Sequence, residues 1–139
     1  MIGAIILAMK NGISISKSLD AISSFPGVKR RTELIGVAKG ISVYDDYGHH
    51  PTEMNATIKA LKKVTNNKLY VVFQPHRYSR TKEYFNLFKD SLRNSDFSIV
   101  TDIYPAGEDP IPGIFSKNFE SENIKYCLLY TSPSPRDLD

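Results

Sequence analysis

Three histidines stand where predicted strands end. His49 and His50 follow the apolar segment 41–44, and His76 follows the apolar run 69–73. In an open sheet of parallel strands these positions share one edge, where such sheets bind ligands. A single histidine there would be read as a hydrogen-bonded loop residue. Three at one edge predict a common binding site, in which an imidazole can act as a general acid or base.

The loop that carries His49 and His50 also carries two neighbouring acids, Asp45 and Asp46. Their carboxylates suit a ribose hydroxyl or a magnesium-bound water. Imidazole and carboxylate are also ligands for transition metals such as zinc. Adjacent histidines cannot easily point at one ion from a regular backbone. We therefore favour a ribose hydroxyl or a magnesium-bound water over a transition metal, and assign no metal ligand.

The second loop joins His76 to two arginines, Arg77 and Arg80. The two arginines fall on one face if a helix begins near Tyr78, since residues three apart are neighbours on a helix surface. Planar guanidinium donors beside a helix amino end suit a carboxylate or a phosphate. The loop therefore predicts an anion site, and a surface network of salt bridges is the alternative.

A third segment, residues 101–113, follows another predicted strand and is rich in turn-forming and acidic residues. It lines the same edge of the sheet, with Asp102 and Glu108 orienting the basic groups, or it is an ordinary loop stiffened by prolines. The sequence leaves both interpretations open.

The elements that must position these loops are strands alternating with helices. Two stretches with apolar residues at helical spacing alternate with two continuous apolar runs, in the order 51–62, 69–73, 81–92 and 97–100. The runs are typical of strands covered on both faces. Residues 32–45 predict two further strands joined by a turn at Lys39 and Gly40. This order predicts an α/β fold with a mostly parallel sheet flanked by helices.

The first 26 residues predict a pair of helices. One covers residues 2–9 and ends at Asn11 and Gly12, and the other follows with Ser16 or Ser18 as its cap. A helix pair without a preceding strand is typical of the tail of a domain. We therefore expect a domain boundary near Pro26.

The composition is that of a soluble globular protein, with 41% apolar and 24% charged residues. The charge of +3 is spread along the chain, so we expect no nucleic acid as a partner. The apolar opening is too short to span a bilayer, so we expect no membrane either. The single cysteine, Cys127, agrees with a reducing cytoplasm.

Several nucleotide and hydrolase motifs are absent from the sequence. It contains neither Gly-x-x-x-x-Gly-Lys-Ser/Thr nor Gly-x-Gly-x-x-Gly, so no independent nucleotide cradle is predicted. The absence of Gly-x-Ser-x-Gly disfavours a serine hydrolase.

Four segments together resemble the UDP-N-acetylmuramate:L-alanine ligases of the Mur ligase family. They are Phe25-Pro26-Gly27-Val28-Lys29-Arg30-Arg31, Asp45-Asp46-Tyr47-Gly48-His49-His50-Pro51-Thr52-Glu53, Phe73-Gln74-Pro75-His76-Arg77-Tyr78-Ser79-Arg80-Thr81 and Asp102-Ile103-Tyr104-Pro105-Ala106-Gly107-Glu108. Tyr47 and Gly48 favour these ligases over the related tripeptide-attaching ligases. The resemblance implies that residues 1–26 are the helical tail of the central ATP-binding domain. It makes residues 27–127 an incomplete carboxy-terminal Rossmann-like domain, whereas residues 128–139 do not resemble the family.

This resemblance implies part of an ATP-dependent amide ligase of peptidoglycan precursor synthesis. ATP would phosphorylate the carboxylate of UDP-N-acetylmuramate, and the amine of L-alanine would attack the acyl phosphate. ATP and Mg²⁺ would be bound mainly by domains outside this chain, so we expect the chain alone to be inactive. One alternative is a noncatalytic Rossmann-like module for a small anionic or amino-acid ligand. Another is a metal-dependent hydrolase that uses His49, His50 and Asp46.

The resemblance also implies roles for single residues. Asp46 resembles the contact to the nucleotide ribose, and Arg30 or Arg31 resembles a contact to ATP. The amino-acid pocket would be formed by Tyr47, His49, His76, Arg77 and Arg80. In that pocket the arginines would hold the carboxylate of L-alanine, and a histidine would orient the amine or the acyl phosphate.

Overall fold

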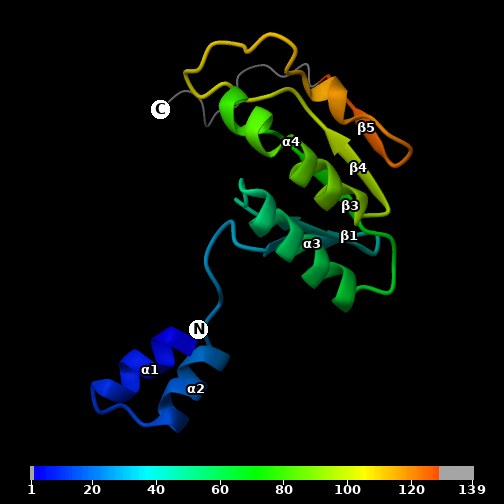
Figure 1. Cartoon of the computed structure of the whole chain (residues 1–139). Helices are drawn as coiled ribbons and strands as arrows, with labels where there is room; N and C mark the ends of the chain where they lie inside the picture. Colours follow the sequence, from blue (N-terminus) through cyan, green and yellow to red (C-terminus); the bar gives the residue numbers. More distant parts are fainter. Residues whose placement is uncertain (1, 129–139) are drawn as a thin grey trace. The chain divides into compact units, whose positions relative to one another are not determined.

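The computed structural model describes residues 2–128, which fall into two compact units that divide between Tyr47 and Gly48 (Figure 1). Within this described part, no helix has both the length and the apolar character needed to cross a membrane. The expected tail at residues 128–139 lies outside the described residues, apart from Leu128. The expected boundary near Pro26 stays a prediction.

The first unit begins with helix α1, Ile2–Lys10, which ends as the sequence predicts. Gly12 adopts a left-handed conformation with φ of 79°, its N–H donates to Met9 O at 3.0 Å, and Ile13 N–H donates to Ala8 O at 3.0 Å. These two bonds satisfy carbonyls that the helix end leaves without partners. No residue of α1 is buried in the first unit.

Helix α2, Ile15–Ser23, starts two residues earlier than the nearer of its predicted caps, Ser16, allows. The cap is Ser14, whose hydroxyl accepts a hydrogen bond from Lys17 N–H at 3.4 Å. Ser18 lies inside the helix instead, where its hydroxyl donates to Ser14 O at 3.1 Å. The prediction of Ser16 or Ser18 as the cap was therefore wrong, because Ser14 already supplies the side-chain oxygen that accepts from a free amide in the first turn.

Strands β1, Glu33–Ala38, and β2, Ile41–Asp45, form an antiparallel hairpin. Lys39 and Gly40 at its turn have φ of 51° and 78°. Two successive left-handed residues match the twist of paired strands and close a hairpin tightly. The predicted hairpin is confirmed. In the first unit these two strands form a two-stranded sheet.

The second unit contains the predicted parallel sheet, with strand order β3-β4-β5. Its elements are α3 Pro51–Val64, β3 Tyr70–Phe73, α4 Tyr78–Arg93, β4 Phe97–Val100, the 3₁₀ helix η1 Ser116–Phe119 and β5 Ile124–Tyr126. The α/β class and the parallel sheet are confirmed.

Helices α3 and α4 cover the same face of this sheet (Figure 1). The core between them consists of Met54, Ile58, Phe73, Phe88, Leu92, Val100, Phe119 and Ile124. On β3, side chains alternate between this core and the opposite face, where Tyr70 is 64% exposed and Val72 is 71% exposed. The prediction that this strand is covered on both faces was wrong for the described residues, because both helices pack on one side.

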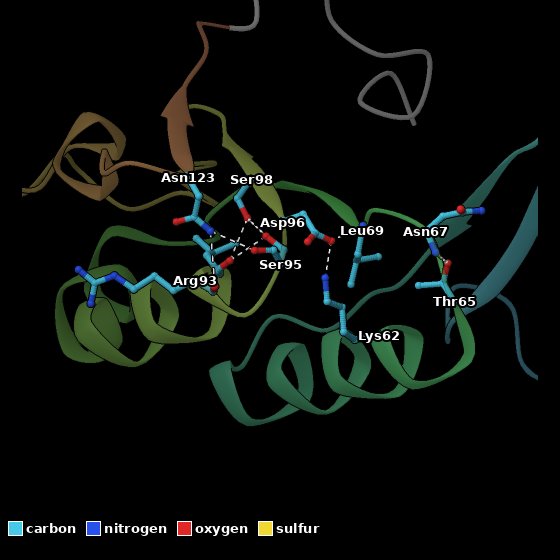
Figure 2. A network of polar contacts seen from close by, with 10 residues as sticks. Lys62, Thr65, Asn67, Leu69, Arg93, Ser95, Asp96, Ser98 and Asn123 are labelled. Atoms are coloured by element: carbon cyan, nitrogen blue, oxygen red, sulfur yellow. Dashed lines mark hydrogen bonds and ion pairs between the residues drawn. The ribbon is translucent and has the colours of Figure 1, made fainter.

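Polar contacts fasten the amino ends of the strands (Figure 2). Asp96, just before β4, forms an ion pair with Lys62 of α3 and accepts a hydrogen bond from Leu69 N–H at 2.7 Å. The Leu69 amide, followed by the Lys62 ammonium, holds the pKa of Asp96 below its usual value. Asn123, just before β5, donates to Ser95 O at 3.0 Å. The loop with His76 leaves the opposite, carboxyl end of β3.

Candidate functional site

The loops after β3 and β4 run side by side beyond the sheet. Tyr104 N–H donates to Pro75 O at 2.8 Å, and Arg77 N–H donates to Tyr104 O at 2.8 Å. His76 and Tyr104 form an isolated parallel bridge, so the pairing of the two strands continues into their loops. The hydrogen bonds fix the backbone that carries His76 and Arg77. Residues 101–104 therefore line the edge of the sheet, which was one of the two interpretations of that segment.

The structure brings His49, His76 and Arg80 together at this edge. The ring centroids of His49 and His76 lie 6.3 Å apart. An Nη1 atom of Arg80 lies 3.4 Å from Nδ1 of His76. The ring of Tyr104 stacks on His76 with centroids 5.4 Å apart and an interplanar angle of 28°. The three side chains are partly buried; His49 and His76 come from loops far apart in sequence, and Arg80 comes from the first turn of α4.

The electrostatics of the cluster keep His76 neutral. Burial is the largest cause that lowers the pKa of His76, and the guanidinium groups of Arg80 and Arg77 and the ring of His49 lower it further. Glu108 acts in the opposite direction. At neutral pH the imidazole of His76 is therefore mostly uncharged and can accept a proton or a hydrogen bond.

Helix α4 begins at the site without a cap of its own. Arg77 occupies the cap position with φ of 73° and makes no side-chain capping bond. The carboxylate of Glu108 takes that place, since Oε2 accepts from Ser79 N–H at 2.9 Å and Oε1 accepts from Ser79 Oγ–H at 2.6 Å. The bonds from the Ser79 hydroxyl and amide lower the pKa of Glu108. The sequence makes Glu108 a candidate for orienting the basic groups, and its carboxylate contacts Ser79 in the helix that carries Arg80.

His50 has a structural role that differs from that of His49. It is the N-cap of α3, where its Nδ1 accepts a hydrogen bond from Thr52 N–H at 3.3 Å. Glu53 completes a capping box, with Oε2 accepting from the amides of His49 and His50, each at 3.3 Å. The ring of His50 lies edge-on to Tyr84 at a centroid distance of 4.8 Å. A proline and a glutamate shortly after His50 were the sequence signals of this cap.

The hypothesis of a metal-dependent hydrolase requires a set of metal ligands, and the described part of the chain contains none of three or more side chains. Residues 2–128 contain no group of three or more His, Cys, Asp or Glu side chains that could hold a metal ion. His50, one of the three residues in that hypothesis, uses its Nδ1 to cap α3.

The other predicted site residues belong to the first unit. Asp46 Oδ2 accepts hydrogen bonds from Thr32 N–H at 2.8 Å and Thr32 Oγ1–H at 3.1 Å. The guanidinium carbon of Arg30 lies 4.7 Å from the centroid of the Tyr47 ring, and Arg30 O accepts from Tyr47 N–H at 2.7 Å. The segment that carries Arg30 and Arg31 is thus fastened to the end of the hairpin, and its orientation relative to Asp46 is set within this unit.

The chain belongs to the Mur ligase family. The family model for the glutamate ligase domain of Mur ligases matches residues 30–124. The chain is similar to the UDP-N-acetylmuramate–L-alanine ligase of Geobacter sp. (strain M21), with 52% identity over 114 residues that cover 81% of the chain and 25% of that protein. The protein of the same name from Endomicrobium trichonymphae is 49% identical over 116 residues, which cover 83% of the chain and 26% of that protein.

The fold agrees with a solved structure of the same family. The crystal structure of a UDP-N-acetylmuramate-alanine ligase from Thermotoga maritima matches with a TM-score of 0.62 and 26% identity. The match covers 89% of this chain and 31% of that chain. The chain spans about a quarter of the length of the curated relatives that it matches.

Proposed function

We propose that this chain is the carboxy-terminal part of an ATP-dependent ligase that joins L-alanine to UDP-N-acetylmuramate in peptidoglycan precursor synthesis. The carboxylate of the muramic acid nucleotide is activated as an acyl phosphate, and the amine of L-alanine displaces the phosphate. The names of the curated relatives support this reaction. We place the reaction in the cytoplasm, which agrees with the free, exposed Cys127.

The observation that carries the proposal is the convergence of His49, His76 and Arg80 at the carboxyl edge of the parallel sheet. In the proposed ligase, Arg77 and Arg80 hold the carboxylate of L-alanine, because planar guanidinium groups bind both oxygens of a carboxylate. The neutral His76 suits an incoming ammonium group, which must lose a proton before it attacks. His49 completes the proposed amino-acid pocket in the second unit, and the family resemblance assigns Tyr47 a contact with the same substrate.

The ATP side of the proposed reaction involves the first unit. Asp46 contacts the ribose, and Arg30 or Arg31 contacts the phosphates of ATP. The hydrogen bonds from Thr32 support this role for Asp46, because they fix the direction of its carboxylate. Among residues 2–128 no side-chain cluster fits a metal ion, so we assign no step on this chain to Mg²⁺. The rest of the ligase would hold the metal and most of the nucleotide.

A chimeric ligase tests the proposal. The carboxy-terminal segment of the Geobacter relative that aligns with this chain is replaced by the chain's own residues, and phosphate release is measured with and without L-alanine. We expect release that depends on both L-alanine and UDP-N-acetylmuramate. A folded chimera that binds L-alanine but releases no phosphate would refute the ligase and favour a noncatalytic binding module.

Arginine variants of the chimera test the assignment of the pocket. Loss of a charge-assisted hydrogen bond costs about 1.5–3 kcal/mol, which corresponds to about a 10- to 100-fold weaker interaction. We expect Arg80→Ala to raise the KM for L-alanine by about that factor. Arg93→Ala is the matched control, because Arg93 lies at the other end of α4, is exposed and pairs only with the nearby Asp90 in the ion pairs found for it. Equal effects of the two variants would contradict the assigned pocket.

A further inference from the structure

The start of α4 depends on a residue 29 positions further along the chain. The first turn of a helix has backbone N–H groups without partners inside the helix, and a capping side chain usually satisfies one of them. At α4 the cap residue Arg77 makes no such bond. Glu108 supplies the acceptor from the loop after β4, with one carboxylate oxygen on the Ser79 amide and the other on the Ser79 hydroxyl.

The loop that carries Glu108 is bent to deliver this carboxylate. Ala106 and Gly107 are both left-handed, with φ of 51° and 83°, and Glu108 N–H donates to Pro105 O at 3.0 Å. A left-handed alanine is strained, so this conformation persists only where surrounding contacts maintain it. The two bonds to Ser79 are such contacts.

The position of Ser79 gives these bonds a consequence for the site. Ser79 lies between Arg77 and Arg80, and Arg80 in turn contacts His76. If the first turn of α4 frayed, Arg80 would no longer be held beside His76. The Arg77 backbone, held at φ of 73°, has its carbonyl engaged by Thr81 N–H at 3.0 Å and Thr81 Oγ1–H at 2.8 Å, both of which need an intact first turn.

We propose that Glu108 is a positioning residue for the amino-acid site: its bidentate contact with Ser79 holds the first turn of α4 so that Arg77 and Arg80 face one carboxylate. This inference rests on the proposed function and adds a residue that does not itself touch the substrate. The negative charge of Glu108 also interacts favourably with the partial positive charge at the amino end of α4.

Kinetics of the chimeric ligase provide the first test. We expect Glu108→Ala to raise the KM for L-alanine about tenfold, the effect of losing one charge-assisted hydrogen bond, with the kcat and the KM for ATP little changed. Glu108→Gln keeps acceptor oxygen but loses the charge, so it should fall between the wild type and Glu108→Ala. Glu122→Ala, at an exposed glutamate in the turn before β5, is the control.

A double variant tests the contact itself. If Glu108 acts through Ser79, the Glu108→Ala, Ser79→Ala double variant should have the same KM for L-alanine as Glu108→Ala alone. Additive effects of the two substitutions would overturn the proposal, and so would an unchanged KM for L-alanine in Glu108→Ala.

Amide hydrogen exchange on the 139-residue chain separates this inference from the proposed function. We expect Glu108→Ala to increase the exchange rate of the Ser79 amide about tenfold, by loss of its acceptor, and to leave the amides in the middle of α4 unchanged. An inactive chimera together with this increase would refute the ligase and retain the role of Glu108 in ordering α4. An unchanged exchange rate of the Ser79 amide would overturn the inference, whether or not the chimera is active. Ser79→Ala removes only the hydroxyl bond to Glu108 and provides a milder variant for comparison.

Discussion

Substitution of His50 separates the structural histidine of the first loop from its neighbour His49. His50 caps α3 through Nδ1, and its ring lies edge-on to Tyr84. Loss of an N-cap costs about 1 kcal/mol, within a range of about 0.5–2 kcal/mol. Loss of an edge-on ring contact costs about 0.5–1.5 kcal/mol. We therefore expect His50→Ala to reduce the free energy of unfolding by about 1–3 kcal/mol.

His50→Asn isolates the two contributions. Asparagine is among the best N-cap residues, so this variant keeps the bond to the helix amide and loses only the ring. We expect it to be about 1 kcal/mol more stable than His50→Ala. For a unit of this size, that difference corresponds to about 4–8 °C in Tm. Urea and thermal unfolding of the chain measure both quantities, with Lys59→Ala on the exposed side of α3 as the control.

Two outcomes would refute the reasoning about His50. If His50→Asn were as unstable as His50→Ala, the capping bond would contribute nothing. If His50→Asn abolished L-alanine dependence in the chimera while remaining folded, His50 would belong to the reacting site and not to the frame of α3.

Three further predictions concern charge and packing in the second unit. Because the pKa of Asp96 is lowered in the folded chain, its carboxylate stabilises the fold above the unfolded pKa of 3.8, and this contribution is lost as the pH falls through the folded pKa. Asp96→Asn should therefore destabilise the chain at pH 7 and differ little from the wild type well below pH 3.8. Urea unfolding at several pH values measures this difference. Arg80→Ala should raise the pKa of His76 in an NMR titration, because it removes a neighbouring positive charge, whereas Arg93→Ala should leave it unchanged. Phe88→Ala should cost about 3–5 kcal/mol in urea unfolding, since Phe88 is 1% exposed and packs 5.1 Å from the Phe73 ring.

Much of the fold follows from local patterns. The hairpin turn needs two residues with positive φ, and Lys39-Gly40 between two apolar segments indicates it directly. Residues close in sequence likewise indicate β3 and β4, through their apolar runs, and α3 and α4, through the helical spacing of their apolar residues. The same patterns could not reveal the order β3-β4-β5 of the parallel sheet, because strand order depends on contacts between residues far apart in sequence.

The sequence by itself determined which chemical groups belong to the site, since His49 and His76 follow predicted strands and Arg80 lies close after His76. Only the tertiary structure decided how those groups divide their work. His50 caps a helix while the adjacent His49 faces His76, and Glu108 bonds to Ser79, 29 residues earlier, in the first turn of α4. The physical reason is that a buried or helix-end N–H must find an acceptor, and which side chain supplies it depends on distances across the fold.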